Sequence, residues 1–159
     1  IYDSRVTSIQ KAQKDVPGQK HAAIDYTKQI GDVNTNTPIG IYGNYFGNKE
    51  HSLIPCASKE EIVLGEAYFY TVIDGNTVEP FKIEITKLHS QKESDIKGIE
   101  FRIEDERLKQ KTNGIVQGMS GSPIVQNGKL IGAVTHVITS DPMKGYGVYI
   151  DWMLENTKQ

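Results

Sequence analysis

The sequence predicts an all-β fold, either a barrel or a sandwich. Short runs rich in β-branched and aromatic residues are separated by turn residues, and strand-like runs do not alternate with helical ones. In the clearest run, residues 78–88, the side chains of Phe81, Ile83 and Ile85 alternate with charged and polar residues, which is the period of a half-buried strand. These features favour an all-β architecture over an α/β one.

The expected elements follow one another along the chain. Extended segments are predicted at residues 1–9, 20–24, 39–45, 67–73, 78–88 and 99–103. Turn residues predict loops at 15–18, 34–38 and 47–49, and a tight turn at 74–76. Two short helices are expected, one capped by Asp105 and extending to Lys111, and a terminal one that begins at Asp151.

Length and charge limit the classes of function. The 159 residues fit one domain with a substantial core, and the net charge of −2 gives no electrostatic basis for binding nucleic acid or an anionic membrane. No apolar run approaches the roughly 18–20 residues of a spanning helix, so any membrane attachment is expected through segments outside this chain. Cys56, the single cysteine, excludes an internal disulfide and a multi-cysteine zinc site, and we interpret it as a small buried side chain.

The most informative motif is Gly118-Met119-Ser120-Gly121-Ser122-Pro123, which has the pattern of a serine-peptidase nucleophile loop. A nucleophilic serine needs a tight turn, so that its own N–H and a neighbouring N–H point at the position of the tetrahedral oxyanion. Gly118 can adopt the unusual backbone angles of such a turn, and Gly121 leaves the other side uncrowded. Taken alone, the motif also fits an ordinary glycine- and serine-containing loop.

The residues after Ser120 distinguish between two kinds of hydrolase. Residues 122–134 read as a strand, an Asn127-Gly128 turn and a second strand, which is a strong hairpin signal. An α/β-hydrolase would place its serine on a turn from strand to helix, and no helical pattern follows Ser120. A nucleophile loop that leads into a hairpin is instead typical of the C-terminal barrel of chymotrypsin-like peptidases.

Segments spread over most of the chain are similar to one known family, in the same order. They are 36–43, 72–75, 112–137, 141–142, 145–150 and 152–154. On these segments the chain resembles SpoIVB, the stage IV sporulation serine peptidase family. The resemblance implies a chymotrypsin-like double β-barrel with an incomplete N-terminal part and a short C-terminal helix. It also implies that residues 1–159 are a single peptidase domain, a fragment without the family's PDZ domain.

The resemblance implies a site around Ser120 as the nucleophile, with no cofactor and no metal. The family's carboxylate position falls on Asp105, fifteen residues before Ser120, although Asp105 equally fits a helix cap. The N–H groups of Gly118 and Ser120 are expected to form the oxyanion hole. The strand that carries Thr135 and His136 is expected to wall the substrate cleft.

The general base is expected outside this chain. The family's catalytic histidine lies in a Gly-His segment N-terminal to the region covered here, and none of His21, His51, His89 and His136 occurs in such a motif. We interpret His136 as a partly buried strand residue rather than the base. The chain is therefore expected to be a processed product, whose own cleaved N-terminal segment is a candidate partner.

The implied function is that of a serine endopeptidase acting on a protein or peptide. By resemblance, it works in the space between forespore and mother-cell membranes and cleaves a regulatory protein, which activates a membrane-bound protease that processes a late sigma factor. The alternative is a barrel without a base that only binds an extended peptide; the intact loop around Ser120 argues against it. A cysteine hydrolase using Cys56 is excluded because no nucleophile loop surrounds that residue.

Overall fold

A closed antiparallel barrel forms the centre of the molecule. The computed structural model describes residues 1–47, 53–155 and 157. Within them, six strands close in the order β10-β11-β7-β6-β5-β9. Their bounds are β5 Gly65–Val72, β6 Val78–Leu88, β7 Ile99–Ile103, β9 Pro123–Gln126, β10 Lys129–Val137 and β11 Lys144–Tyr149. The barrel confirms the predicted all-β, chymotrypsin-like fold.

The barrel closes around apolar side chains that its strands turn inward. In β6, Phe81, Ile83 and Ile85 are buried while the residues between them are exposed, as the alternating sequence predicts. The rings of Phe81 and Phe101 each lie 6.1 Å from the ring of Phe69 in the centre of the barrel. This packing gives the strands that surround the Ser120 loop a rigid support.

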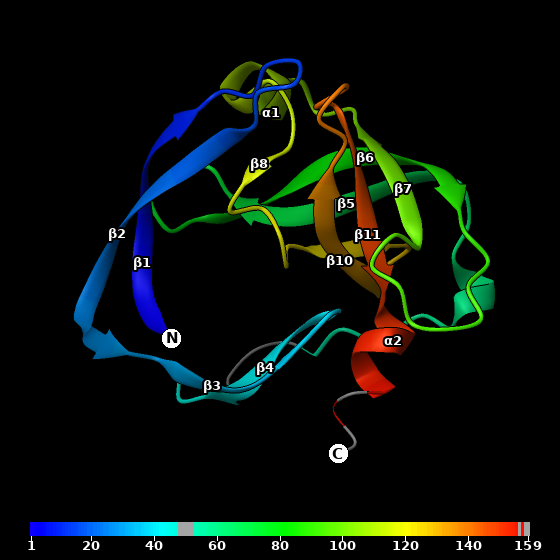
Figure 1. Cartoon of the computed structure of the whole chain (residues 1–159), viewed down its shortest axis with the longest axis horizontal. Coiled ribbons are helices and arrows are strands. Elements are labelled where there is room, and N and C mark those ends of the chain that lie inside the picture. Colours follow the sequence, from blue (N-terminus) through cyan, green and yellow to red (C-terminus); the bar gives the residue numbers. More distant parts are fainter. Residues whose placement is uncertain (48–52, 156, 158–159) are drawn as a thin grey trace.

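The N-terminal strands form two open sheets instead of a second barrel in the described part of the chain. Strand β1 (Tyr2–Gln10) pairs antiparallel with β2 (Gly18–Gln29), which pairs parallel with the short β8 (Val116–Gln117). Strands β3 (Gly31–Thr37) and β4 (Gly40–Tyr45) form a separate hairpin. Figure 1 shows these strands as an arch beside the barrel.

Three short helical segments connect or follow the strands. They are the 3-10 helix η1 (Lys59–Glu61), α1 (Glu106–Thr112) and α2 (Ile150–Glu155). Asp105 caps α1, because its side chain accepts a hydrogen bond from the Leu108 N–H at 3.0 Å. Both predicted helices are confirmed, and they lie at opposite ends of the barrel (Figure 1). In the described residues, no helix has the length and apolar character needed to cross a bilayer.

The predictions for residues 34–38 and for Cys56 are wrong. The predicted loop 34–38 overlaps β3, whose polar residues are held by backbone pairing with β4 and not by burial. Cys56 is exposed rather than buried. The extended segment around it pairs with Leu130, and its neighbour Ala57 takes the inward position, so the alternation of side chains turns Cys56 to solvent. Much of the predicted loop 47–49 lies outside the described residues.

Candidate functional site

The Ser120 loop is a tight turn between β8 and β9. Gly118 and Gly121 have φ angles of 93° and 83°, in the left-handed region that favours glycine. Between them, the side chain of Met119 is fully buried in the core and anchors the turn. The Gly121 N–H donates to the carbonyl of Val134 in β10 at 2.8 Å. The loop therefore has the backbone that the motif predicts, with Ser120 at its exposed tip.

Two backbone N–H groups of this loop have no internal acceptor. Among the described residues, neither the Gly118 N–H nor the Ser120 N–H donates a hydrogen bond, whereas those of Met119, Gly121 and Ser122 all do. An oxyanion hole requires unpaired N–H groups, such as those of a nucleophilic serine and of a residue just before it. These are the two groups that the sequence predicts for that role.

The two serine hydroxyls of the loop differ in accessibility. Ser120 is exposed, and its Oγ donates to the carbonyl of Thr135 at 3.0 Å. Ser122 is only 9% exposed, and its Oγ donates to Thr71 Oγ1 at 3.1 Å inside the barrel. Ser120 is therefore the hydroxyl of this loop that a substrate can reach.

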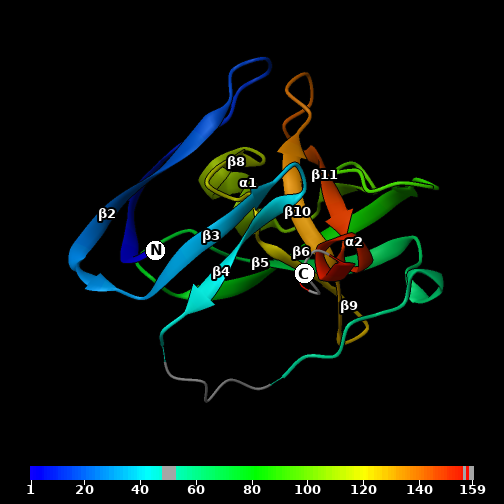
Figure 2. The ribbon, with the colours of Figure 1, turned by 60° about the horizontal axis from the view of Figure 1, so that its bottom comes forward.

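A pocket of about 550 Å³ opens beside Ser120. The turn between β3 and β4 lies over β10 and near α2, as Figure 1 and Figure 2 show, and these elements form the walls. The lining side chains are mostly small or apolar and include Ile39, Ile41, Ile96, Ala133, Val148 and Met153. Thr135 and His136 line the same pocket as Ser120, where the predicted substrate cleft should lie.

The end of β10 offers a free strand edge next to Ser120. Pairing of β9 with β10 stops at Ala133, and Val134 exchanges backbone hydrogen bonds with Gly121 and Ser122, so the later residues of β10 have no strand neighbour on that side among the described residues. On the other side, the Ile138 N–H donates to Lys144, and by strand alternation the N–H and C=O of Val137 point toward the free edge. An extended peptide can add to such an edge through backbone hydrogen bonds.

The histidines occupy different places. His136 is exposed and lines the pocket, so its prediction as a partly buried residue is wrong. The hydroxyl of Ser120 is bonded to the Thr135 carbonyl and not to the imidazole. His21 is exposed on β2. His89 lies with its Nε2 3.6 Å from a carboxylate oxygen of Glu100, too long for a hydrogen bond. His51 lies outside the described residues.

Asp105 and Ser120 are not in contact. One carboxylate oxygen of Asp105 caps α1, and the other lies 3.7 Å from the guanidinium of Arg107. Helix α1 lies at the end of the barrel away from α2, whose Met153 lines the Ser120 pocket (Figure 1). The structure thus gives Asp105 a capping role, and its role as the orienting acid stays a prediction.

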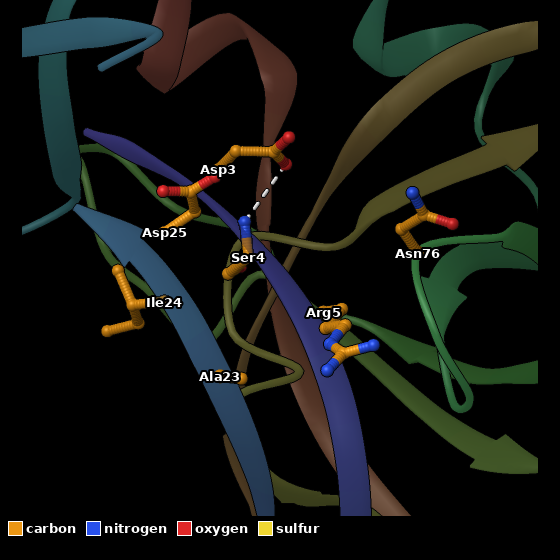
Figure 3. Close-up of a pocket in the computed structure, with 7 residues that line it drawn as sticks. All are labelled: Asp3, Ser4, Arg5, Ala23, Ile24, Asp25 and Asn76. Carbon is orange, nitrogen blue, oxygen red and sulfur yellow. Dashed lines mark hydrogen bonds between the residues drawn. The ribbon is translucent and has the colours of Figure 1, made fainter. Parts of the chain in front are cut away.

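A second pocket, of about 420 Å³, lies on the β1–β2 hairpin and contains none of these residues. Figure 3 shows Asp3 and Asp25 on neighbouring strands of this pocket. Hydrogen bonds from Lys28 to Asp3, and from Thr27 to Asp25, lower the pKa of both carboxyl groups. These carboxylates are already partnered. Within the described residues, no cluster of His, Cys, Asp and Glu is arranged to hold a metal ion.

Two residues that contact the loop, Lys20 and Thr71, are not singled out by any pattern in the sequence. Lys20 Nζ donates to Thr71 Oγ1 at 2.6 Å, and burial lowers the pKa of Lys20 to about 8. The sequence predicts only that each of them lies in a strand. The pairing of β2 with β8, which brings Lys20 to the loop, joins segments far apart in the sequence and leaves no local pattern.

Comparison with known proteins identifies the family. The family model described as SpoIVB peptidase S55 matches residues 1–154 of the chain. No curated protein and no solved structure matches it. The family is one of sporulation serine peptidases. An accessible serine and free N–H groups are what such a peptidase needs, and the Ser120 loop has both. The chain belongs to the SpoIVB peptidase S55 family and is a serine peptidase.

Proposed function

We propose that this peptidase hydrolyses a protein substrate with Ser120 as the nucleophile and the N–H groups of Gly118 and Ser120 as the oxyanion hole. The observation that carries the proposal is the exposed Ser120 hydroxyl in a turn whose two relevant N–H groups have no internal acceptor. The buried, bonded Ser122 hydroxyl argues against the neighbouring serine. We also propose that residues 1–159 act as a single peptidase domain.

The reaction follows from these groups. Ser120 Oγ forms a bond to the substrate carbonyl carbon while its proton passes to a general base, and the resulting oxyanion accepts hydrogen bonds from the two free N–H groups. The C–N bond then breaks, and the base returns the proton to the leaving amine. Water repeats the sequence on the acyl-enzyme. The carbonyl of Thr135 holds the Ser120 hydroxyl but is no base, so the hydroxyl must turn toward one.

For the base, we propose the histidine of the Gly-His motif that precedes this region in the family, with Asp105 as the acid that orients it. Support for both comes from the family motif. His136 is the alternative base inside the chain, since it lines the Ser120 pocket. Asp105 would have to use an oxygen that now faces Arg107.

The substrate is proposed to bind as an extended strand. Its backbone would pair with the free edge of β10 at Thr135 and Val137, and a side chain near the scissile bond would enter the apolar pocket. By membership of the family, we propose sporulation signalling as the setting, in the space between the forespore and mother-cell membranes. There the peptidase would cleave a regulatory protein, and its own N-terminal segment, so that a membrane-bound protease processes a late sigma factor.

Peptide-bond hydrolysis by loop variants of the full-length protein tests the nucleophile. Ser120→Ala should lose activity by a factor of about 10⁴ or more, because no other hydroxyl of the loop is accessible. Ser94→Ala, in an exposed loop, is the matched control and should be unchanged. If Ser120→Ala remained active while Ser122→Ala lost all activity, Ser122 would be the nucleophile and the proposal would be wrong.

His136→Ala in the same assay distinguishes the two candidate bases. We expect only a modest loss, through altered contacts with the substrate. A loss as large as that of Ser120→Ala would make His136 the base.

A further inference from the structure

Lys20, Thr71 and Ser122 form a hydrogen-bonded chain beneath the nucleophile loop. Lys20 Nζ donates to Thr71 Oγ1 at 2.6 Å, and Ser122 Oγ donates to the same oxygen at 3.1 Å. Thr71 and Ser122 are buried, and each of these two bonds spans 51 residues of sequence. The chain therefore connects the open N-terminal sheet, the barrel strand β5 and the C-terminal side of the Ser120 loop.

The stem of Lys20 also contacts the other side of the loop. A Cβ atom placed on Gly118 would lie 3.2–3.5 Å from the Cβ, Cγ and Cδ atoms of Lys20. The position follows from the parallel pairing of β2 with β8, which aligns Gln19 with Gln117 and so brings Lys20 beside Gly118. One side chain thus contacts Gly118 directly and Ser122 through Thr71, and Ser120 lies between those two residues.

The amine of Lys20 is held there without a carboxylate. None of the ion pairs in the described part of the chain involves Lys20, and burial is what lowers its pKa. A half-buried cation without a counter-ion is unfavourable, so the amine depends on its hydrogen bond to Thr71 to stay in this position.

We propose that Lys20 is a positioning residue of the active site, which fixes both sides of the Ser120 loop and so preorganises the two oxyanion-hole N–H groups. The inference rests on the proposed role of Ser120. Lys20 acts through Gly118, Thr71 and Ser122, and its effect is on the transition state rather than on the binding of substrate. Loss of its amine should therefore lower kcat while KM stays nearly constant.

Lys20→Met in the full-length protein tests this directly, because methionine keeps most of the apolar stem and removes the amine. We expect kcat to fall about 10- to 100-fold, the scale of a small misplacement of reacting groups. Lys28→Met, on the same strand but bonded to Asp3 at the surface, is the matched control and should keep its kcat. Thr71→Val breaks the chain at its centre and should lower kcat on its own. Combined with Lys20→Met, it should lower kcat little further, because both changes break the same hydrogen-bonded chain.

NMR order parameters of the Gly118 and Ser120 amides provide a readout that does not depend on catalysis. They should fall in Lys20→Met and in Thr71→Val but not in Lys28→Met. An unchanged kcat in Lys20→Met, or additive losses with Thr71→Val, would overturn the proposal. So would unchanged order parameters. If instead Ser120→Ala were active, the proposed function would fail, and the order parameters would still report whether Lys20 fixes the loop.

Discussion

The barrel and the N-terminal hairpins both contain apolar strand residues, but only the barrel buries them. Phe81 and Phe101 are fully buried in the barrel. In β2, by contrast, Ile24 is 48% exposed and Tyr26 is 73% exposed. The barrel strands close on themselves around a shared apolar core, whereas β1 to β4 pair through their backbones with little packing behind them.

The proposed active site lies where these two regions meet. Ser120 and the two free N–H groups belong to a loop anchored in the barrel core by Met119. The β3–β4 turn walls the pocket, and Lys20 of β2 contacts the loop. The barrel thus holds the proposed nucleophile, while the N-terminal region forms one wall of its pocket and contacts its loop.

The largest expected effect is on turnover, and it tests whether the catalytic groups come from both the barrel and the N-terminal region. If Asp105 orients a histidine, Asp105→Asn in the full-length protein should lower turnover by a factor of about 10³–10⁴. Its stability should change little, because asparagine caps a helix about as well as aspartate. Steady-state kinetics and urea denaturation of the same variant measure the two effects. Turnover near the wild-type value would leave Asp105 with only the capping role that the structure describes.

The next effect is on the free energy of unfolding, which substitutions in the barrel and in the N-terminal hairpins should lower by different amounts. Phe101→Ala removes a fully buried ring and should cost about 3–5 kcal/mol of the free energy of unfolding. Ile24→Ala in β2 should change it by about 0.5 kcal/mol or less, because the side chain is half exposed. Urea denaturation followed by circular dichroism gives both values. Equal losses would show that the hairpin residues are packed in solution and would remove the contrast between the regions.

The smallest effect is the pH dependence that Lys20 adds to the free energy of unfolding, at the place where the two regions meet. Burial lowers the pKa of Lys20 to about 8 in the folded chain, and the unfolded value is about 10.4. Between these values the unfolded state binds more protons, so the free energy of unfolding should rise with pH. Denaturation at about pH 7 and about pH 9.5 should show this rise in the wild type and not in Lys20→Met. A rise of the same size in Lys20→Met would assign it to other groups.

Local signals explain what the sequence could predict. The Asn127-Gly128 turn, with φ angles of 51° and 75°, joins β9 to β10 as expected, and Asp105 caps α1. The alternation in β6 locates that strand with its observed bounds. In the same way, the glycines around Ser120 predict the turn and its free N–H groups, because their backbone requirement is local.

Long-range pairing explains what the sequence could not predict. Strand β3 is polar, and only its partner β4 makes it a strand. The Lys20–Thr71–Ser122 chain depends on the parallel pairing of β2 with β8, for which no local pattern exists. The exposure of Cys56 likewise depends on which face of its segment meets β10.

The most direct test of Ser120 as the nucleophile is the site of covalent labelling by a serine-directed fluorophosphonate. The full-length protein is labelled, digested and mapped by mass spectrometry, with Ser120→Ala and Ser122→Ala alongside. We expect the label on Ser120 in the wild type and in Ser122→Ala, and no label in Ser120→Ala, since Ser120 carries the accessible hydroxyl beside the free N–H groups. A label on Ser122, or labelling that persists in Ser120→Ala, would contradict it.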